Sequence, residues 1–264
     1  MTNPLCYIHN PDRKRLRTFS MAEYTADINV CNIALSYGGD GTLLSLFRQL
    51  CSVSRHGDVL IAGYNKGTVG FMANDMPEEN FISSVIQAYR YFAVKNDNRY
   101  IQKRYLLKAI LKDKQVYALN EISIHPSEYG KLFVCDVYFT IPKLGIDKER
   151  ITYKGDGLIL STTSGSTAYN LSAGGPLLLP TGRNMTVTPI CPFSLADRSI
   201  VLSGGVHIRI DFDQNAHIVV DGQPLVNDIN SIDIKLTNEV ANLYKCDNFF
   251  ETIQSKLGWN HSIK

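Results

Sequence analysis

The sequence lacks the patterns that mark several common classes of protein. No apolar run approaches the ~18 residues that a membrane-spanning helix needs, and the first residues show no signal pattern of basic and then apolar residues. The chain has 27 Lys and Arg against 25 Asp and Glu, a balance unlike the basic excess of nucleic-acid binders. We therefore expect a cytoplasmic protein that engages neither a membrane nor nucleic acid.

Common metal-binding and catalytic patterns are missing as well. The six cysteines form no C-x-x-C pair, which argues against a zinc site and suits a reducing compartment. The sequence contains neither a Walker A pattern nor the G-x-S-x-G of serine hydrolases, so any bound nucleotide is held in another way. One basic cluster, Arg13–Arg17, is either a solvated face or a contact to an anionic ligand.

The first third of the chain alternates predicted strands and helices. Apolar runs predict strands within 5–9, 28–37 and 59–63, and apolar residues at helical spacing predict helices within 43–51 and 78–92. Such alternation is typical of a Rossmann-like parallel sheet covered by helices. We expect this N-terminal α/β domain to span residues 1–98.

Strand patterns dominate residues 99–247, which we expect to form a second, β-rich domain. They predict strands at 105–111, 116–124, 132–140, 157–161, 199–202, 206–212, 217–220, 231–236 and 240–245. The tail has apolar residues at helical spacing over 249–257. We expect residues 248–264 to contain a C-terminal helix that returns to the first domain and completes it.

The most chemically informative segment is Gly38-Gly39-Asp40-Gly41-Thr42, between a predicted strand and a predicted helix. Glycines at a helix start let backbone N–H groups approach an anion, and the helix dipole favours phosphate there. A carboxylate beside phosphates suits cation binding or acceptance of a hydroxyl proton, and both roles indicate phosphoryl transfer. The alternative is a tight turn in which Asp40 caps the helix.

Three further segments carry possible binding groups. Asn120-Glu121 interrupts a strand-like run and either reads ribose hydroxyls or caps a bulge. The stretch Ser161–Pro176 is dense in hydroxyls, small residues and glycines, which suits a flat ligand lying against the backbone, although a plain Ser/Thr-rich loop is the alternative. Lys154-Gly155-Asp156-Gly157 repeats the Gly-Asp-Gly theme but is also a common turn.

Taken in order, these segments resemble the NAD kinase family. The resemblance rests on Gly38–Thr42, Asn120-Glu121 and Thr163–Pro176, of which the last is the most specific. It extends over residues 28–259 through Thr188–Pro192 with Ser194, Leu195 and Arg198, then Asp221–Gln223 and Lys256–Trp259. Lys154 departs from the family, where many members have Arg, as does the stretch Tyr64–Gly70.

The resemblance implies an activity and a set of ligands. The reaction would move a phosphoryl group from ATP, or in some members polyphosphate, to the 2′-hydroxyl of the adenosine ribose of NAD, giving NADP. NAD would lie between the two domains, with a divalent metal such as Mg²⁺, and the chain would form a homo-oligomer, usually a tetramer. The identity of the metal ligands is not implied.

The resemblance also implies roles for individual residues. Asp40 matches the catalytic aspartate, and Gly38, Gly39, Gly41 and Thr42 form the donor phosphate loop. The positions matching NAD-binding residues are Asp40, Gly41, Phe71, Asn120, Glu121, Asp156, Thr167, Ala168, Tyr169, Ser172, Leu195 and Asp221. Asp156 matches an aspartate that reaches NAD from a neighbouring subunit.

Two alternative functions share parts of this pattern. Lipid kinases and sugar kinases of the same superfamily carry a similar first loop, but the Thr163–Pro176 segment argues against both. A dinucleotide sensor without catalytic activity is an alternative of a different class, and the intact Asp40 loop argues against it.

Overall fold

The computed structural model describes residues 3–9, 23–67, 70–95, 99–111, 114–128, 130–245 and 248–259. The basic cluster Arg13–Arg17 and Cys246 lie outside these ranges. The chain divides into two compact units, Met1–Lys103 with Val240–Lys264 and Arg104–Glu239, called unit 1 and unit 2 below. The domain limits expected from the sequence, at 98/99 and 247/248, stay a prediction.

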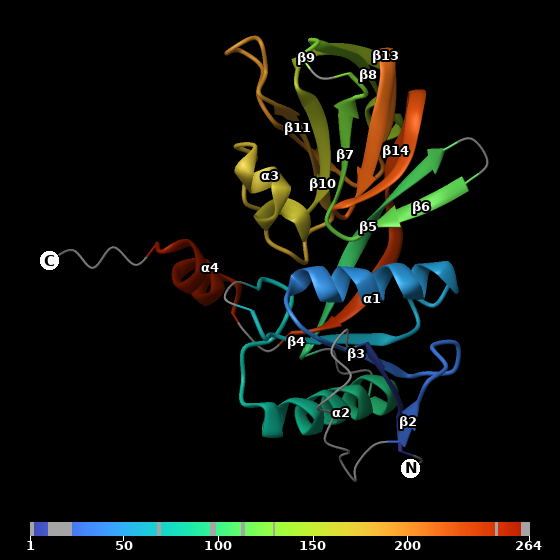
Figure 1. Ribbon diagram of the computed structural model, residues 1–264, viewed down its shortest axis with the longest axis vertical. Helices are drawn as coiled ribbons and strands as arrows, with labels where there is room; N and C mark the ends of the chain where they lie inside the picture. Colours follow the sequence, from blue (N-terminus) through green and yellow to red (C-terminus); the bar gives the residue numbers. More distant parts are fainter. Residues whose placement is uncertain are drawn as a thin grey trace, which may run out of the picture. The chain divides into compact units, whose positions relative to one another are not determined.

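Unit 1 is an α/β layer on a parallel sheet, as the sequence predicts. Its strands are β1 (Leu5–His9), β2 (Glu23–Thr25), β3 (Ile33–Tyr37), β4 (Leu60–Tyr64) and the end of β14 (Gln223–Tyr244). They pair in parallel in the order β2–β1–β3–β4–β14. Figure 1 shows the helices α1 (Asp40–Ser52) and α2 (Glu78–Lys95) on opposite faces of this sheet. The expected C-terminal helix, α4 (Phe249–Leu257), belongs to unit 1.

The core of unit 1 explains why these segments form. Every residue of β3 is buried, which matches its near-continuous apolar run. One stripe of α1 is buried, through Leu43, Leu44, Leu46, Phe47 and Leu50. On the other side, Phe81, Ile82 and Val85 of α2 join the same core as Leu35 and Leu60. Burying each of these side chains contributes about 1.5–3 kcal/mol.

Unit 2 is an antiparallel β structure. Its strands are β5 (Ile101–Leu111), β6 (Lys114–Ala118), β7 (Glu121–Pro126), β8 (Phe133–Ile141), β9 (Ile146–Gly155), β10 (Gly157–Thr162), β11 (Asn184–Ile190), β12 (Ile200–Ser203), β13 (His207–Val220) and most of β14. The main path runs β12–β11–β10–β7–β13–β14, and the β8–β9 hairpin joins the first half of β13. Inward-facing residues such as Ile124, Leu158 and Ile218, which are register partners across three strands, form the core.

Short helices follow β10 and β8 in unit 2. They are η3 (Gly165–Thr167), α3 (Tyr169–Ser172) and η2 (Pro142–Leu144). Figure 1 shows α3 beside β10, and the two are in contact. Within the described ranges no helix combines the length and apolarity needed to cross a membrane.

The structure corrects several strand predictions. The run 116–124 is broken at 119–120 into β6 and β7, while 206–212 and 217–220 belong to one irregular strand, β13. Likewise 231–236 and 240–244 belong to β14, which ends at Tyr244. Strands β9 and β11 were not predicted. Most of β9 is exposed and polar, and the short alternation of β11 is interrupted by Pro189, which is disfavoured within strands.

Candidate functional site

In unit 1 the candidate donor loop joins β3 to α1. The helix begins at Asp40, and its N-cap is Gly39, which makes no side-chain cap hydrogen bond. The alternative in which Asp40 caps the helix is therefore wrong. A Cβ at Gly38 would lie 2.2 Å from Oγ1 of Thr42, so close packing explains that glycine. At Gly39 and Gly41 no described atom lies within 4 Å of such a Cβ, so their bare backbone borders open space.

Asp40 is fixed by a segment that follows β4. Its Oδ2 accepts a hydrogen bond from the backbone N–H of Phe71 at 2.7 Å, and its Oδ1 accepts one from Ala73 at 2.9 Å. The N–H of Met72 donates to both oxygens, at 3.1 and 3.2 Å. The structure thus brings together Phe71 and Asp40, two of the predicted site residues, and three successive amides set the orientation of the carboxylate.

The segment Phe71–Asn74 is also held in place by the hydrogen bonds of two buried side chains. The Nζ of Lys245 donates to the carbonyl of Ala73 at 2.8 Å, and Lys245 is only 6% exposed. The side-chain amide of Asn74 donates to the carbonyls of Gly63 and Tyr244. These anchors were not predicted, because Lys245 and Ala73 are 172 positions apart and no local pattern connects them.

In unit 2 the candidate ribose-reading pair lies at the break between β6 and β7. Asn120 is in the turn and Glu121 begins β7. Asp221, in the turn between β13 and β14, accepts backbone N–H bonds from Leu119 at 2.9 Å, Asn120 at 2.7 Å and Glu121 at 3.1 Å. The structure therefore brings together three predicted residues, Asn120, Glu121 and Asp221.

Two side-chain atoms of this cluster are left for a ligand. The Oδ1 of Asn120 and the Oε2 of Glu121 are buried, and neither has a hydrogen-bond partner among the described residues. Burial, and then the negative charge of Asp221, raise the pKa of Glu121 to about 8 against the opposing hydrogen bond from the backbone N–H of Tyr169. A buried polar atom without a partner is costly, so these two atoms mark a place where a polar ligand is expected.

The Ser/Thr-rich segment divides into a structural part and an accessible part. Residues 161–166 are buried, and their hydroxyls bond to nearby backbone, as when Thr163 donates to the carbonyl of Pro180. These residues form the end of β10, a turn and the start of η3, so their hydroxyls serve the fold in that part. The predicted NAD-binding residues Thr167, Ala168, Tyr169 and Ser172 are half-buried or exposed. These four residues are therefore accessible to a ligand, as are other members of the segment such as Gly174.

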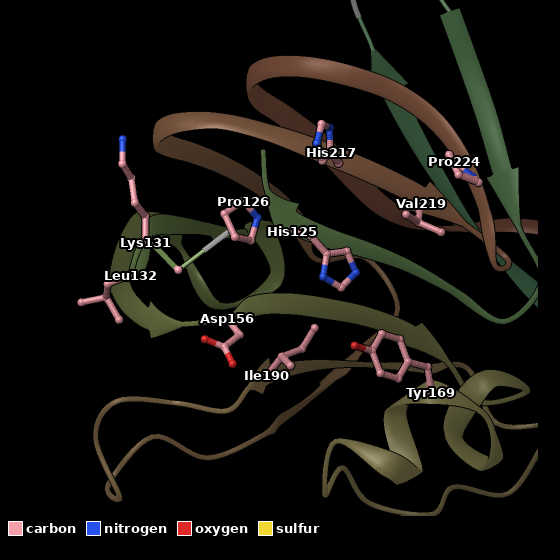
Figure 2. A pocket seen from close by; sticks show the side chains of 11 residues that line it. His125, Pro126, Lys131, Leu132, Asp156, Tyr169, Ile190, His217, Val219 and Pro224 are labelled. Carbon is pink, nitrogen blue, oxygen red and sulfur yellow. The ribbon is translucent and has the colours of Figure 1, made fainter. Parts of the chain in front are cut away.

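A pocket of about 1150 Å³ opens in unit 2 beside this segment (Figure 2). Its lining includes two predicted residues, Asp156 and Tyr169, together with His125, His217 and Lys131, which the sequence did not single out. The rings of His125 and Tyr169 are nearly parallel, with centroids 6.2 Å apart and planes 17° from each other. Burial, and then His217, lowers the pKa of His125. The pocket combines flat rings with apolar and charged groups.

Asp156 and Leu195 occupy loops at the edge of this part of unit 2. The glycines that flank Asp156 are required by packing, since a Cβ at Gly155 or Gly157 would lie within 2.6 Å of a backbone oxygen. Asp156 itself is exposed. Leu195 is 86% exposed in the loop between β11 and β12 and does not line the described pocket.

Comparisons with known proteins agree with this arrangement. Residues 119–247 match the family described as the ATP-NAD kinase C-terminal domain. The chain is 34% identical over 253 residues to an NAD kinase of Sulfurimonas denitrificans, covering 91% of this chain and 82% of the relative. This relative confirms the family resemblance seen in the sequence.

Solved structures of related enzymes share the fold. The crystal structure of yeast NADH kinase complexed with NADH matches 92% of this chain and 72% of its own, with a TM-score of 0.74 and 26% identity. An NAD kinase from Archaeoglobus fulgidus in complex with ATP matches 95% of this chain and 99% of its own, with a TM-score of 0.72 and 23% identity. They confirm the expected fold class, and with the sequence relatives they lead to one conclusion. This chain belongs to the NAD kinase family.

Proposed function

We propose that this enzyme transfers the terminal phosphoryl group of ATP to the 2′-hydroxyl of the adenosine ribose of NAD. The observation that carries the proposal is the pairing, at the start of α1, of a backbone-fixed carboxylate with open glycine backbone. Asp40 accepts three amide hydrogen bonds, while Gly39 and Gly41 border open space. A phosphate-binding backbone next to an oriented carboxylate is what phosphoryl transfer to a hydroxyl requires.

The donor site is proposed at the N-terminus of α1. The phosphates of ATP would accept hydrogen bonds from the backbone around Gly39 and Gly41 and from the hydroxyl of Thr42, which is half-buried. The aligned peptide dipoles of a 13-residue helix add a favourable potential for these anions. The archaeal relative, whose structure contains ATP, supports ATP as donor.

Asp40 is proposed to be the catalytic residue. Its carboxylate would accept a hydrogen bond from the 2′-hydroxyl and so aim that oxygen at the terminal phosphorus of ATP. As the new O–P bond forms, the bond from phosphorus to the ADP oxygen breaks and the hydroxyl proton passes to Asp40. Because its own oxygens are held by the amides of Phe71–Ala73, the carboxylate needs little reorganisation, and orientation is its main contribution.

The acceptor site is proposed in unit 2. Asn120 and Glu121 would hydrogen-bond ribose hydroxyls through the two buried atoms that have no partner among the described residues. Thr167, Ala168, Tyr169 and Ser172 would contact the rest of the dinucleotide, with a flat ring of NAD lying against Tyr169. The yeast relative, whose structure contains NADH, supports a dinucleotide as ligand. Phe71, Asp156, Leu195 and Asp221 are proposed to belong to the same site.

We propose that a divalent metal ion, Mg²⁺, enters the site bound to the phosphates of ATP. The described residues contain no group of three or more His, Cys, Asp or Glu that could hold a metal ion. Mg²⁺ in such enzymes keeps several waters and binds substrate phosphates with only one or two carboxylates, so the residues present fit a donor-borne ion. When bound, it neutralises charge on the phosphates.

We also propose a cytoplasmic homotetramer. Phe193 is 76% exposed and Leu195 86% exposed, and such apolar side chains in one loop suit burial in a subunit contact. The five cysteines within the described ranges form no disulfide with one another, which suits a reducing compartment. Sedimentation of the purified chain tests the oligomer.

A panel of acceptors tests the proposed reaction. The purified enzyme would be supplied with labelled ATP and, separately, NAD, NADH, a diacylglycerol and a sugar phosphate, and then with polyphosphate in place of ATP. We expect label in NADP when NAD is the acceptor. Label in the lipid or sugar alone would favour another kinase of the superfamily, and NAD binding without transfer from either donor would favour a sensor.

A further inference from the structure

Asp221 is predicted from the resemblance to bind NAD, yet its surroundings point to a different task. The residue is 3% exposed, and both carboxylate oxygens accept backbone N–H bonds from the turn that carries Asn120. Oδ2 takes the N–H of Leu119, and Oδ1 takes those of Asn120 and Glu121. Its own N–H donates to the carbonyl of Glu121 at 3.0 Å, so the contact is reciprocal.

The carbonyl side of the same turn is held by Thr162. Its Oγ1 donates to the carbonyl of Leu119 at 2.6 Å, and its backbone N–H donates to the carbonyl of Asn120 at 2.8 Å. Gly165 completes the contact, because a Cβ there would lie 2.2 Å from the carbonyl oxygen of Asn120. The amides of the turn therefore donate hydrogen bonds to Asp221, and its carbonyls accept hydrogen bonds from Thr162.

This arrangement leaves only side-chain atoms of the turn available. The Oδ1 of Asn120 and the Oε2 of Glu121 are buried and lack a partner among the described residues, whereas the backbone beside them is satisfied. A backbone held on both sides keeps these two atoms in one place. Such preorganisation is what a directional contact to a ligand hydroxyl needs.

Asp221 holds the turn at an energetic cost. Its φ of +46° lies in the left-handed region, which a residue with a side chain rarely adopts. Its negative charge is also buried near the carboxyl group of Glu121, and like charges at such a site repel. Strained or repulsive features that persist in a fold are concentrated at functional sites.

We propose that Asp221 is a positioning residue for NAD phosphorylation, which holds the backbone of Leu119–Glu121 so that Asn120 and Glu121 meet the ribose hydroxyls, and which does not itself touch the dinucleotide. This inference rests on the proposed function of Asn120 and Glu121 as ribose-binding residues.

The charge of Asp221 adds a second effect on Glu121. The titratable groups that face Glu121 are Asp221, from the β13–β14 turn, and Tyr169, from α3. The phenol of Tyr169 has its pKa raised by burial and then by the charges of Cys191, Glu121 and Asp156. With its pKa raised to about 8, Glu121 is protonated near neutral pH and can donate its proton in a hydrogen bond to a ribose oxygen. Binding of NAD then weakens as pH rises through about 8.

The test is Asp221→Asn in the full chain, with kcat and KM for NAD and ATP measured from about pH 6 to about pH 9.5. Loss of a charged acceptor from three amides is expected to raise KM for NAD by about 10- to 100-fold and to leave KM for ATP unchanged. Removing the charge also lowers the pKa of Glu121, so the alkaline fall in kcat/KM for NAD moves to lower pH. A purely structural role for Asp221 predicts instead that KM for NAD and KM for ATP are not affected separately, because a general loosening of the fold would not act on NAD binding alone.

Asp233→Asn, the same substitution at an exposed position on β14, is the matched control and should leave both constants unchanged. Asn120→Ala and Glu121→Ala report on the proposed function itself, because Glu121→Gln would keep a hydrogen-bond donor in place of the protonated carboxyl group. If they raise KM for NAD while Asp221→Asn changes it less than twofold and leaves the pH profile in place, the positioning role is wrong and the site stands. If neither of them affects KM for NAD, the ribose-binding site itself is wrong.

A second variant covers the case in which Asp221→Asn does not fold. Thr162→Val removes the Oγ1 donor to Leu119 with little change in volume. We expect it to raise KM for NAD without moving the pH profile, because it removes no charge. An unchanged KM for NAD in folded Thr162→Val would overturn the positioning of the turn as a requirement for binding.

Discussion

The carboxylate of Asp40 lies 2.7 Å from the backbone amide nitrogen of Phe71, although the two residues are 31 positions apart. The same relationship recurs in the other unit, where the carboxylate of Asp221 lies 2.7 Å from the amide nitrogen of Asn120 across 101 positions. In each case three successive N–H groups converge on one aspartate. Each unit thus fixes one of its own candidate loops through three backbone amides and one aspartate.

Gly41 in unit 1 and Gly165 in unit 2 are glycines for different structural reasons and should respond differently to replacement by alanine. Gly41→Ala enters open space inside a helix, so stability should rise by about 0.5–1 kcal/mol, while KM for ATP rises because the added methyl group obstructs the donor phosphates. Gly165→Ala drives a Cβ into the carbonyl of Asn120 and should cost about 1–3 kcal/mol or more. Thermal unfolding and ATP titrations check both. Equal losses of stability would contradict this distinction.

The raised pKa of Glu121 leads us to expect that the stability of the protein depends on pH in a specific way. Its pKa rises from the ordinary 4.5 to about 8 in the folded state, chiefly through burial and then through Asp221. The folded chain holds this proton more tightly than the unfolded chain, so the stability gained is complete below pH 4.5 and is lost as pH rises to about 8.

Glu121→Gln removes this ionisation while keeping the shape of the side chain. Its stability advantage over the parent should therefore grow between about pH 5 and pH 8, by up to ~1.4 kcal/mol for each pH unit. Thermal melts of the two proteins across this range measure the difference. A constant difference would show that Glu121 has an ordinary pKa in the folded state.

Tyr169 is expected to bind NAD through its ring. Tyr169→Ala removes the flat surface opposite His125 and should weaken NAD binding about fivefold to tenfold, while Tyr169→Phe keeps the ring and should bind nearly as the parent does. Tyr138→Ala, on β8 and outside the pocket of Figure 2, is the control. Calorimetric titration with NAD measures all three. Equal weakening in the Phe and Ala variants would assign the contact to the hydroxyl.

Two lysines of unit 1, one buried and one in a partly exposed ion pair, should differ in their effect on stability and on kcat. Lys245 donates to the buried carbonyl of Ala73, and Lys245→Met should cost about 1–3 kcal/mol and lower kcat, because the segment that fixes Asp40 loosens. Lys256 pairs with Asp75, which is 70% exposed, so Lys256→Met should cost about 1 kcal/mol or less with kcat unchanged. Denaturant unfolding and steady-state rates test the pair. If folded Lys245→Met has the kcat of the parent, the hydrogen bond from Lys245 to Ala73 is not needed for catalysis.

Local sequence patterns predicted the fold correctly where a segment's structure depends on its own apolar residues. The buried strand before Gly38 and the apolar stripe of α1 follow directly from the spacing of apolar residues. The β9 strand escaped because it is mostly exposed and so has no apolar alternation. The break at 119–120 escaped because its amides bond to Asp221, about a hundred positions away, and no short window of sequence contains both partners.

The candidate site was predicted by residue type but not by arrangement. Glycines and an aspartate at a helix start, and a polar pair within an apolar run, are visible in the sequence. The anchors Lys245 and Thr162 and the pocket residue His125 carry no local motif, since their partners are set by the fold.

The substitution Asp40→Asn tests the central claim most directly. The rate of NADP formation from NAD and ATP would be measured for the parent, for Asp40→Asn and for Asp75→Asn, an exposed carboxylate changed in the same way in unit 1. We expect kcat of Asp40→Asn to fall by about 10²–10⁴-fold, with KM for NAD little changed and the fold intact by circular dichroism. Asp75→Asn should match the parent. A kcat for folded Asp40→Asn within a few-fold of the parent would contradict the account, because the reaction would then proceed without its proposed base.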